Sequence, residues 1–237
     1  MPIQLSFHYG SIPVDLAIDE LFLVGYGGRN AAQVEAHIAE LALLGMKRPH
    51  STPCLYPVNP ALLTQREEIS VYGEDTVPEV EFVLFDLGGR KFVSVGNDQS
   101  DLEVERVLSA EKSKNLCMKS VAREVWALDE VADHWDDLRL QLLCRGKALQ
   151  DGPVSELARP QTLFDIVTRD VGVNLGGRAI FSGTIPMAAT VPPAPYDLQI
   201  RLTDPKRGKT IRHEFSVRRL GLLHGTEKAP AVSPSSH

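Results

Sequence analysis

Residues 79–85, with the sequence Glu-Val-Glu-Phe-Val-Leu-Phe, constrain the fold more than any other segment, because they place charged side chains in an otherwise apolar strand. Alternate side chains of a β-strand lie on the same face, so Glu79 and Glu81 share a face with Val83 and Phe85. The opposite face carries apolar side chains alone. Both faces are therefore expected to be buried, with the two carboxylates entering the interior side by side.

Adjacent buried carboxylates repel each other and lose hydration, so each needs a proton, a cationic partner or a metal ion. Carboxylate oxygens are hard ligands that suit Mg²⁺, Mn²⁺ or Ca²⁺ better than Zn²⁺, which usually recruits His or Cys. In the alternative interpretation, Glu79 lies at the exposed start of the strand and Glu81 pairs with Arg90 or Lys91 across a hairpin. The two residues alone leave both interpretations open.

Asp98 is a third candidate ligand. It follows the predicted partner strand at 91–95 and precedes a predicted helix, so the turn into that helix would carry it back beside Glu79 and Glu81. An Asp at the start of a helix is commonly an N-cap, which is the alternative role for Asp98. Together the three carboxylates would complete a metal site.

His37 and Glu40 form a possible acid–base pair. Residues three apart on a helix are neighbours, so Glu40 can orient His37 and raise its basicity. The alternative is a solvated surface pair without a catalytic role.

Hydrophobic periodicity gives the remaining elements. Strands are predicted at 3–7, 21–24, 79–85, 91–95, 171–181 and in a surface hairpin over 198–217, and helices at 31–44, 102–114, 128–142 and 163–168. Strands outnumber helices and do not alternate with them regularly, which disfavours a doubly wound parallel sheet. The predicted fold class is therefore a β-rich α+β domain.

Composition excludes several classes of function. The 25 Lys and Arg against 31 Asp and Glu give a net charge of −6, which disfavours nucleic-acid binding. The longest nearly unbroken apolar stretch, residues 21–25, is far shorter than the roughly 20 residues of a membrane helix, and the N-terminus lacks signal-peptide features. A cytoplasmic protein without a membrane partner is expected. Cys54, Cys117 and Cys144 form no CxxC pair and are expected to be buried thiols.

Taken in order, five motifs resemble those of the fumarylacetoacetate hydrolase superfamily, in particular its small bacterial members. They are Gly28-Arg29-Asn30 ahead of the helix with His37 and Glu40, a proline-containing lid at 55–63, the trio Glu79, Glu81 and Asp98, Lys119-Ser120, and a Ser-Gly-Thr-Ile-Pro turn that contains Thr184. The resemblance covers roughly residues 21–217. It leaves residues 1–20 as an N-terminal strand and lead-in, and residues 218–237 as a mobile tail rich in Pro, Ser and Ala.

The resemblance implies layered, rolled mixed β-sheets with a few peripheral helices, in a protein that is usually a homodimer. It implies a divalent metal, Mg²⁺ or else Mn²⁺ or Ca²⁺, and hydrolysis of a carbon–carbon bond in a small anionic 1,3-dioxo or 2-oxo acid such as an acylpyruvate. The implied roles are metal binding for Glu79, Glu81 and Asp98, water activation for His37 with Glu40, enolate stabilisation for Lys119, and substrate binding for Arg29 and Thr184.

Two departures from the superfamily pattern leave other activities open. Residues 55–58 lack the lid lysine, and residues 100–103 read Ser-Asp-Leu-Glu where Ser-Ala-Arg-Asp is usual. The alternatives are a decarboxylase, isomerase or hydratase of a 2-oxo acid that uses the same metal, or a ligand-binding member without turnover.

Overall fold

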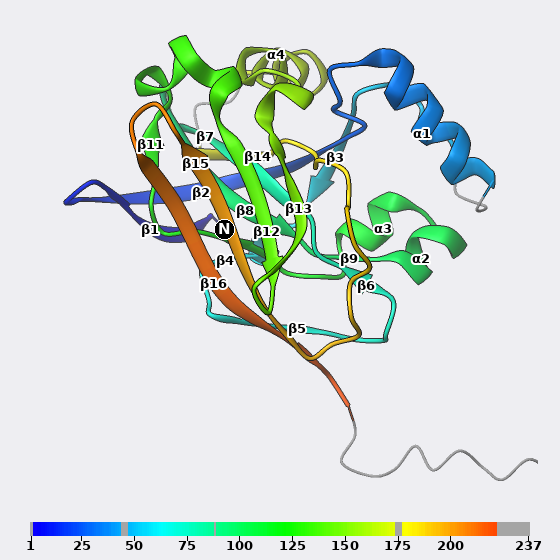
Figure 1. Cartoon of the computed structure of the whole chain (residues 1–237). Coiled ribbons are helices and arrows are strands. Elements are labelled where there is room, and N and C mark those ends of the chain that lie inside the picture. The colour runs from blue at the N-terminus through cyan, green and yellow to red at the C-terminus, as the bar shows by residue number, and fades with distance from the viewer. Residues whose placement is uncertain (1, 44–46, 88, 174–176, 222–237) are drawn as a thin grey trace, which may run out of the picture.

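The structure is a computed structural model that describes residues 2–43, 47–87, 89–173 and 177–221. A nine-stranded mixed sheet has the order β1-β2-β14-β7-β8-β10-β4, with β3 beside β2 and β11 beside β8 (Figure 1). Its strands are β1 (Ile3–Tyr9), β2 (Ile12–Gly25), β3 (Cys54–Val58), β4 (Leu63–Thr64), β7 (Val80–Leu87), β8 (Arg90–Asp98), β10 (Lys119–Val121), β11 (Trp126–Ala127) and β14 (Gly177–Phe181).

A second, five-stranded sheet has the order β13-β12-β15-β16-β5. Its strands are β5 (Glu68–Val71), β12 (Arg139–Cys144), β13 (Lys147–Pro153), β15 (Tyr196–Asp204) and β16 (Lys209–Arg219), while β6 (Thr76–Val77) pairs separately with β9 (Ser100–Asp101). The helices are α1 (Ala31–Leu43), α2 (Leu102–Val107), α3 (Ala110–Lys114) and α4 (Pro160–Val171).

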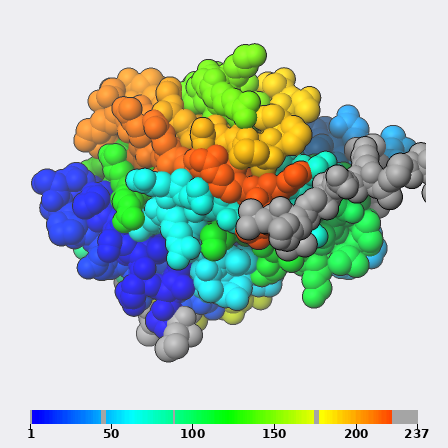
Figure 2. Space-filling view, turned by 90° about the horizontal axis from the view of Figure 1, so that it is seen from below, coloured from blue at the N-terminus to red at the C-terminus, as the bar shows by residue number. Residues whose placement is uncertain are grey.

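The two large sheets form layers. Figure 2 shows the orange strands β15 and β16 on one side of the molecule and the blue N-terminal strands on the other. In Figure 1 the helices α1, α2 and α3 lie together at one edge of the sheets. Since β14 runs parallel to β2 and antiparallel to β7, the larger sheet is mixed. The predicted β-rich α+β fold with layered mixed sheets is confirmed.

Strand β7 lies between two hydrophobic cores. The side chains of Val80, Phe82 and Leu84 belong to the core between the sheets. Val83 and Phe85 belong to a second core on the opposite face, with residues of β1 and β2. The prediction that both faces of this strand are buried is therefore confirmed.

Two predicted helices are present, and one is longer than expected. Helix α1 begins after Asn30, whose Oδ1 accepts hydrogen bonds from the backbone N–H groups of Ala32 and Gln33. Helix α4 spans 12 residues and begins with Pro160, a favoured residue in the first helical turn.

The single helix predicted over 102–114 is wrong. Helix α2 ends before Leu108, and Ser109 begins α3 by accepting a hydrogen bond from the Lys112 N–H at 3.4 Å. An N-cap residue is extended rather than helical, so Ser109 interrupts the helix. The interruption redirects α3 toward the start of β7.

The helix predicted over 128–142 is also wrong, since this segment forms short 3₁₀ turns followed by strand β12. Leu138, Leu140 and Leu142 are all fully buried and alternate with more exposed residues. This period of two fits a strand whose one face is buried, although the wider spacing of apolar residues had matched a helix.

Strand β2 crosses the expected boundary between residues 20 and 21 without a break, so β1 and β2 belong to the main sheet. At the other end, β16 extends to Arg219, and residues 222–237 of the expected tail lie outside the described residues. The three cysteines are buried and unpaired, as predicted. In the described part of the chain, no helix is long and apolar enough to cross a membrane.

His213 connects the two large sheets and predicts a pH-dependent stability. Its Nε2 lies 2.7 Å from the Ser120 Oγ of β10, and its ring stacks on Phe215. Burial, and then nearby Arg123, lowers the pKa of the imidazole, so the folded protein holds it neutral. A histidine whose pKa is lower in the folded state binds more protons when unfolded, so its contribution to stability is lost as the pH falls through about 6.5.

We therefore expect the Tm to fall between pH 7.5 and 5.5, and to fall less in His213→Gln. Thermal melts at both pH values measure this difference. His8→Gln, at an exposed position, is the control and should keep the wild-type pH dependence. An unchanged slope in His213→Gln would contradict the prediction.

Candidate functional site

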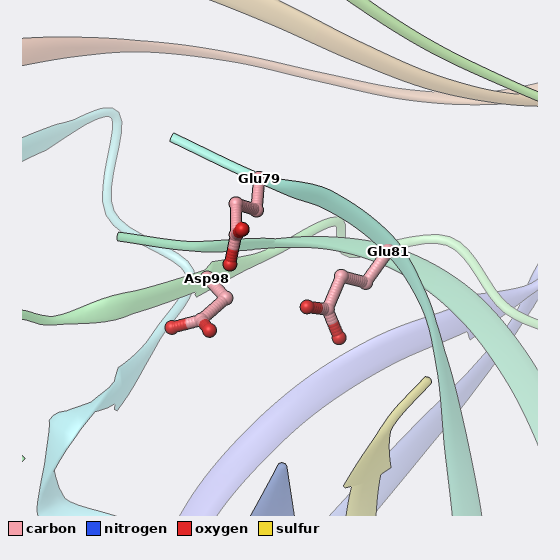
Figure 3. Close-up of side chains that lie close together, drawn as sticks. All are labelled: Glu79, Glu81 and Asp98. Atoms are coloured by element: carbon pink, nitrogen blue, oxygen red, sulfur yellow. The ribbon is translucent and has the colours of Figure 1, made fainter. Parts of the chain in front are cut away.

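The pairing of β7 with β8 brings together the three predicted metal ligands. Glu79 lies opposite Asp98, and their backbones exchange hydrogen bonds of 3.1 and 2.9 Å. Glu81 lies two residues further along the same face, opposite Gly96. One carboxylate oxygen of each residue lies within 4.8 Å of the others. Figure 3 shows the three side chains extending from these two strands into one region.

Buried amides and hydroxyls hold the start of β7 in place. The Glu79 N–H donates to Asn97 Oδ1 at 3.1 Å, and the Val80 N–H donates to Gln150 Oε1 at 2.8 Å. Thr184 Oγ1 donates to the Val80 carbonyl at 2.8 Å. These side chains fix the backbone from which the carboxylates project.

Glu81 is enclosed by the protein and has no ion-pair partner of its own among the described residues. It is 2% exposed, and Oε2 accepts a hydrogen bond from the Gly183 N–H at 2.8 Å. Arg90 and Lys91 lie opposite Leu87 and Asp86, so the predicted alternative pairing of Glu81 across the hairpin is wrong. Burial raises the pKa of Glu81 well above its ordinary value, and Asp98 and Glu79 raise it further.

Lys114, at the end of α3, enters the same cluster. Its Nζ lies 2.9 Å from Glu79 Oε2 and 3.0 Å from Ser100 Oγ, and it forms an ion pair with Asp98. Burial opposes the charge on Lys114, but the Asp98 and Glu79 carboxylates outweigh it and raise the pKa of the ammonium. The sequence analysis missed Lys114 as a member of this cluster, because its position depends on the break between α2 and α3.

Lys119, on strand β10, also contacts the cluster through Asp98. It lies opposite Asp98 in the β8–β10 ladder, with Nζ 2.7 Å from Asp98 Oδ1 and donating to the Gln99 carbonyl at 2.6 Å. Its side chain is 0% exposed, against 12% for Lys114. Burial alone would raise the pKa of Asp98, but Lys114 and Lys119 together lower it.

The cluster fits a divalent metal by its donor set and its charge. Glu81 contacts neither lysine among the ion pairs described, and its raised pKa means that without an ion it holds a proton. When Glu81 ionises, three carboxylates face two ammonium groups, and the one unbalanced negative charge favours a bound cation. All three ligand groups offer oxygen atoms, as Mg²⁺, Mn²⁺ and Ca²⁺ prefer. Glu79 and Asp98 would be shared between such an ion and Lys114.

A cavity of about 690 Å³ lies on the side of the cluster that faces α2, and none of the three carboxylates or the two lysines lines it. Its wall includes Phe22 of β2, Tyr26 directly after β2, Tyr56 of β3 and Glu105 of α2. Burial raises the pKa of Glu105, whose carboxylate also interacts with Lys114 and Glu79. Glu105 is therefore the cavity residue whose charge is coupled to the carboxylate cluster.

The structure places His37 and Glu40 at the surface of α1, apart from the carboxylates. His37 Nδ1 lies 3.8 Å from Glu40 Oε2, and the side chains are 61% and 76% exposed. The His37 ring lies 6.4 Å from the ring of Tyr26, which lines the cavity. Among the described residues, neither His37 nor any other residue of α1 lines the cavity.

The side chains of Arg29 and Thr184 are engaged in protein contacts. Arg29 donates to the Leu157 carbonyl at 3.0 Å and pairs with Asp136 at 2.8 Å. Arg29, with Arg159, lowers the pKa of Asp136 to about 2. The Thr184 hydroxyl lies between Val80 and Gln150. Neither residue lines the cavity, and Thr184 holds the start of β7 in place.

Comparison with known proteins gives one family and a common fold. The family described as "Protein of unknown function (DUF2848)" matches residues 24–215, and no curated protein matches the sequence. A fumarylpyruvate hydrolase from Pseudomonas aeruginosa, solved in complex with Mn²⁺ and pyruvate, is 15% identical with a TM-score of 0.66, over 92% of this chain and 96% of its own.

Two further solved structures extend the comparison. A candidate fumarylacetoacetate isomerase/hydrolase from Oleispira antarctica is 17% identical with a TM-score of 0.66, over 89% of this chain and 98% of its own. A 2-keto-3-deoxy-D-arabinonate dehydratase in its apo form is 18% identical with a TM-score of 0.58, over 86% of this chain and 74% of its own. These likenesses confirm the fold that the motifs predicted.

Proposed function

The chain belongs to the DUF2848 protein family and has the fumarylacetoacetate hydrolase fold, and from these two facts we propose that it is a metal-dependent enzyme acting on a small 2-oxo acid. The observation that carries the proposal is the convergence of Glu79, Glu81 and Asp98, with one carboxylate oxygen of each within 4.8 Å of the others. A cavity of about 690 Å³, whose wall residue Glu105 interacts electrostatically with the cluster, offers space for a small acid nearby. The reaction we propose is hydrolysis of a carbon–carbon bond in an acylpyruvate-like acid.

Glu79, Glu81 and Asp98 would hold the divalent ion, which when bound supplies a Lewis acid for the 2-oxo and carboxylate oxygens of the substrate. Lys119 keeps Asp98 ionised and in position. The more accessible Lys114 would attract the anionic substrate and stabilise the enolate left by carbon–carbon cleavage. In this proposal Lys114 takes the role that the resemblance implied for Lys119.

His37, oriented by Glu40, would accept a proton from the attacking water and contribute about 10²–10⁴ to the rate. Because its side chain is 61% exposed on α1, this role requires α1 to move toward the cavity when substrate binds.

The position of His37 favours a second candidate function. Dehydration, decarboxylation or isomerisation of a 2-oxo acid also passes through an enolate but needs no activated water, so it would proceed without His37 in the cavity. The fold shared with a 2-keto-3-deoxy-D-arabinonate dehydratase supports this alternative. A binding protein without turnover would show ligand-dependent stabilisation and no product.

Acetylpyruvate with Mn²⁺ or Mg²⁺ tests the proposed reaction. Hydrolysis should yield pyruvate and acetate without carbon dioxide, and EDTA should abolish it. We expect His37→Ala to lower turnover by about 10²–10⁴ while Mn²⁺ binding stays unchanged. Wild-type turnover in His37→Ala would point to another base, and the absence of turnover in the wild-type protein would refute the hydrolase.

A further inference from the structure

Tyr26 has a backbone conformation that is unusual for its residue type. Its φ of +55° lies in the left-handed region, which favours glycine and asparagine. A bulky side chain persists there only when the surrounding structure enforces it, and such residues concentrate at functional sites. Tyr26 directly follows β2, at the wall of the cavity.

Tight packing on both sides of Tyr26 imposes this conformation. A Cβ atom added at Gly25 would lie 2.5 Å from the Tyr56 ring, and one added at Gly27 would lie 2.8 Å from the Ser182 carbonyl oxygen. The chain on either side of Tyr26 thus passes too close to its neighbours for a side chain. The conformation is therefore set by contacts with β3 and with the segment after β14.

The Tyr26 side chain is near the predicted base and shares a cavity wall with Glu105. Its ring lies 6.4 Å from the His37 ring of α1. Tyr26 and Glu105 line the same cavity, and the charges of Glu105, Lys114 and Glu79 influence the Tyr26 phenol. Tyr26 therefore lies within the electrostatic reach of the carboxylate cluster.

The Tyr26 hydroxyl is available as a hydrogen-bond donor. Burial, followed by the charge of Glu105, raises the pKa of the phenol, so it keeps its proton at neutral pH. Among the hydrogen bonds of the described residues, the Tyr26 hydroxyl makes none, whereas the hydroxyls of Tyr9 and Tyr196 bond to Glu130 and Gln99. An unpartnered donor in a cavity wall is suited to a ligand oxygen.

We propose that Tyr26 is a substrate-binding residue whose hydroxyl donates a hydrogen bond to the substrate oxygen farthest from the carboxylate cluster. The inference rests on the proposed function. In an acylpyruvate, the carboxylate and 2-oxo oxygens would lie at Glu79, Glu81 and Asp98, so the oxygen at Tyr26 is that of the distal carbonyl. The distal carbonyl carbon then lies toward His37.

This placement gives Tyr26 a part in the chemistry. The water oxygen bonds to the distal carbonyl carbon, a water proton goes to His37, and the carbonyl electron pair moves onto the oxygen that faces Tyr26. When the carbonyl re-forms, the carbon–carbon bond breaks and its electron pair leaves as the enolate of pyruvate, which takes the proton from His37. The carboxylic acid product releases its own proton to solvent. The hydrogen bond from Tyr26 is strongest while the oxygen carries negative charge.

Tyr26→Phe tests the inference by removing one oxygen atom. With Mn²⁺ present, we expect kcat for acetylpyruvate to fall about 10²-fold, as on loss of one oxyanion donor. The inhibition constant of pyruvate, which lacks the distal carbonyl, should stay unchanged. Tyr72→Phe, at a side chain that is 79% exposed, is the matched control and should behave as wild type.

The outcomes separate this inference from the proposed function. A wild-type protein without turnover of acetylpyruvate overturns both. An active wild type with an equally active Tyr26→Phe variant overturns the inference alone, and so does an equal loss of pyruvate inhibition, because it would place Tyr26 at the metal end.

Tyr26→Asn separates binding from packing, since asparagine tolerates the left-handed conformation. Because the Tyr26 ring packs against the core that contains residues of β1 and β2, Tyr26→Asn should lower the Tm, whereas Tyr26→Phe should keep the wild-type Tm. Both variants should show the same loss of kcat. A Tyr26→Phe variant with wild-type kcat beside an impaired Tyr26→Asn variant would show that the ring acts by packing alone and would overturn the inference.

Discussion

Glu81→Gln is expected to abolish tight Mn²⁺ binding while leaving the metal-free protein folded. Replacing a residue that hydrogen-bonds to a metal ligand typically lowers metal affinity about 10–100-fold. Loss of a direct ligand should therefore lower the Mn²⁺ affinity about 100-fold or more. Glutamine preserves the volume of a side chain that is 2% exposed and removes its repulsion with Asp98 and Glu79. Titration calorimetry with Mn²⁺ measures the affinity, and thermal melts measure the stability.

The stability of the same variant should depend on pH differently from that of the wild-type protein. The raised pKa of Glu81 means that the folded metal-free protein holds the proton more tightly than the unfolded chain. Its contribution to stability is present at low pH and is lost as the pH rises above the ordinary value of 4.5 and through the folded pKa. Glu81→Gln should lack this loss.

Asp86→Asn, on the same strand but outside the cluster, is the matched control and should bind Mn²⁺ as wild type does. If Glu81→Gln bound Mn²⁺ with wild-type affinity, the three-carboxylate site would be wrong.

Lys119→Met should have the largest effect on stability. Its ammonium is 0% exposed and contacts Asp98 Oδ1 at 2.7 Å and the Gln99 carbonyl at 2.6 Å, so methionine would leave both oxygens short of a buried partner. Removing one partner of a buried ion pair costs about 3–5 kcal/mol. Because Lys114 still neutralises Asp98, we expect about 3 kcal/mol, or a Tm lowered by about 10 °C for a chain of this length.

Two other lysines make the measurement specific. Lys114→Met removes the same charge from the same carboxylate, but at a side chain that is 12% exposed, so its loss of Tm should be smaller. Lys147→Met, at an exposed position beside the β12–β13 turn, should melt as wild type does. A Tm for Lys119→Met equal to that of Lys147→Met would show that the buried ion pair contributes nothing to the fold.

The alternation within residues 79–85 was sufficient to predict that Glu79 and Glu81 share one face of a buried strand, but it left open whether they pair with lysine or arginine or bind a metal. A period of two fixes which side chains share a face, and Asp98 completes the trio because the hairpin register places it opposite Glu79. Local pattern therefore predicted the carboxylates and the burial of both faces of β7.

Lys114 could not be predicted in the same way, because no local pattern fixes where an isolated lysine points. Its contact with Glu79 depends on the helix break before α3, which Ser109 begins. The periodicity of this stretch suggested a single helix. The Ser109 cap ahead of an acidic residue was the available signal. Likewise, tertiary burial determined that Leu138, Leu140 and Leu142 lie on a strand.

Tyr26 was missed for a related reason. Its place in the cavity wall depends on its positive φ and on the close approach of neighbouring segments to Gly25 and Gly27. Hydrophobic periodicity predicts neither feature. The glycines around it were visible in the sequence, but they indicated a turn and not which side chain the turn would present.

The burial of β7 on both faces divides the protein into an inner part that cannot readily vary and an outer part that can. Glu79 and Glu81 stand at the start of a strand packed between two cores, so mutations there carry a folding cost. The cavity wall comes instead from peripheral segments, among them α2 and residues 47–51. If the proposed function holds, selection for new substrates, in nature or in directed evolution, would therefore change those outer segments and keep the three carboxylates.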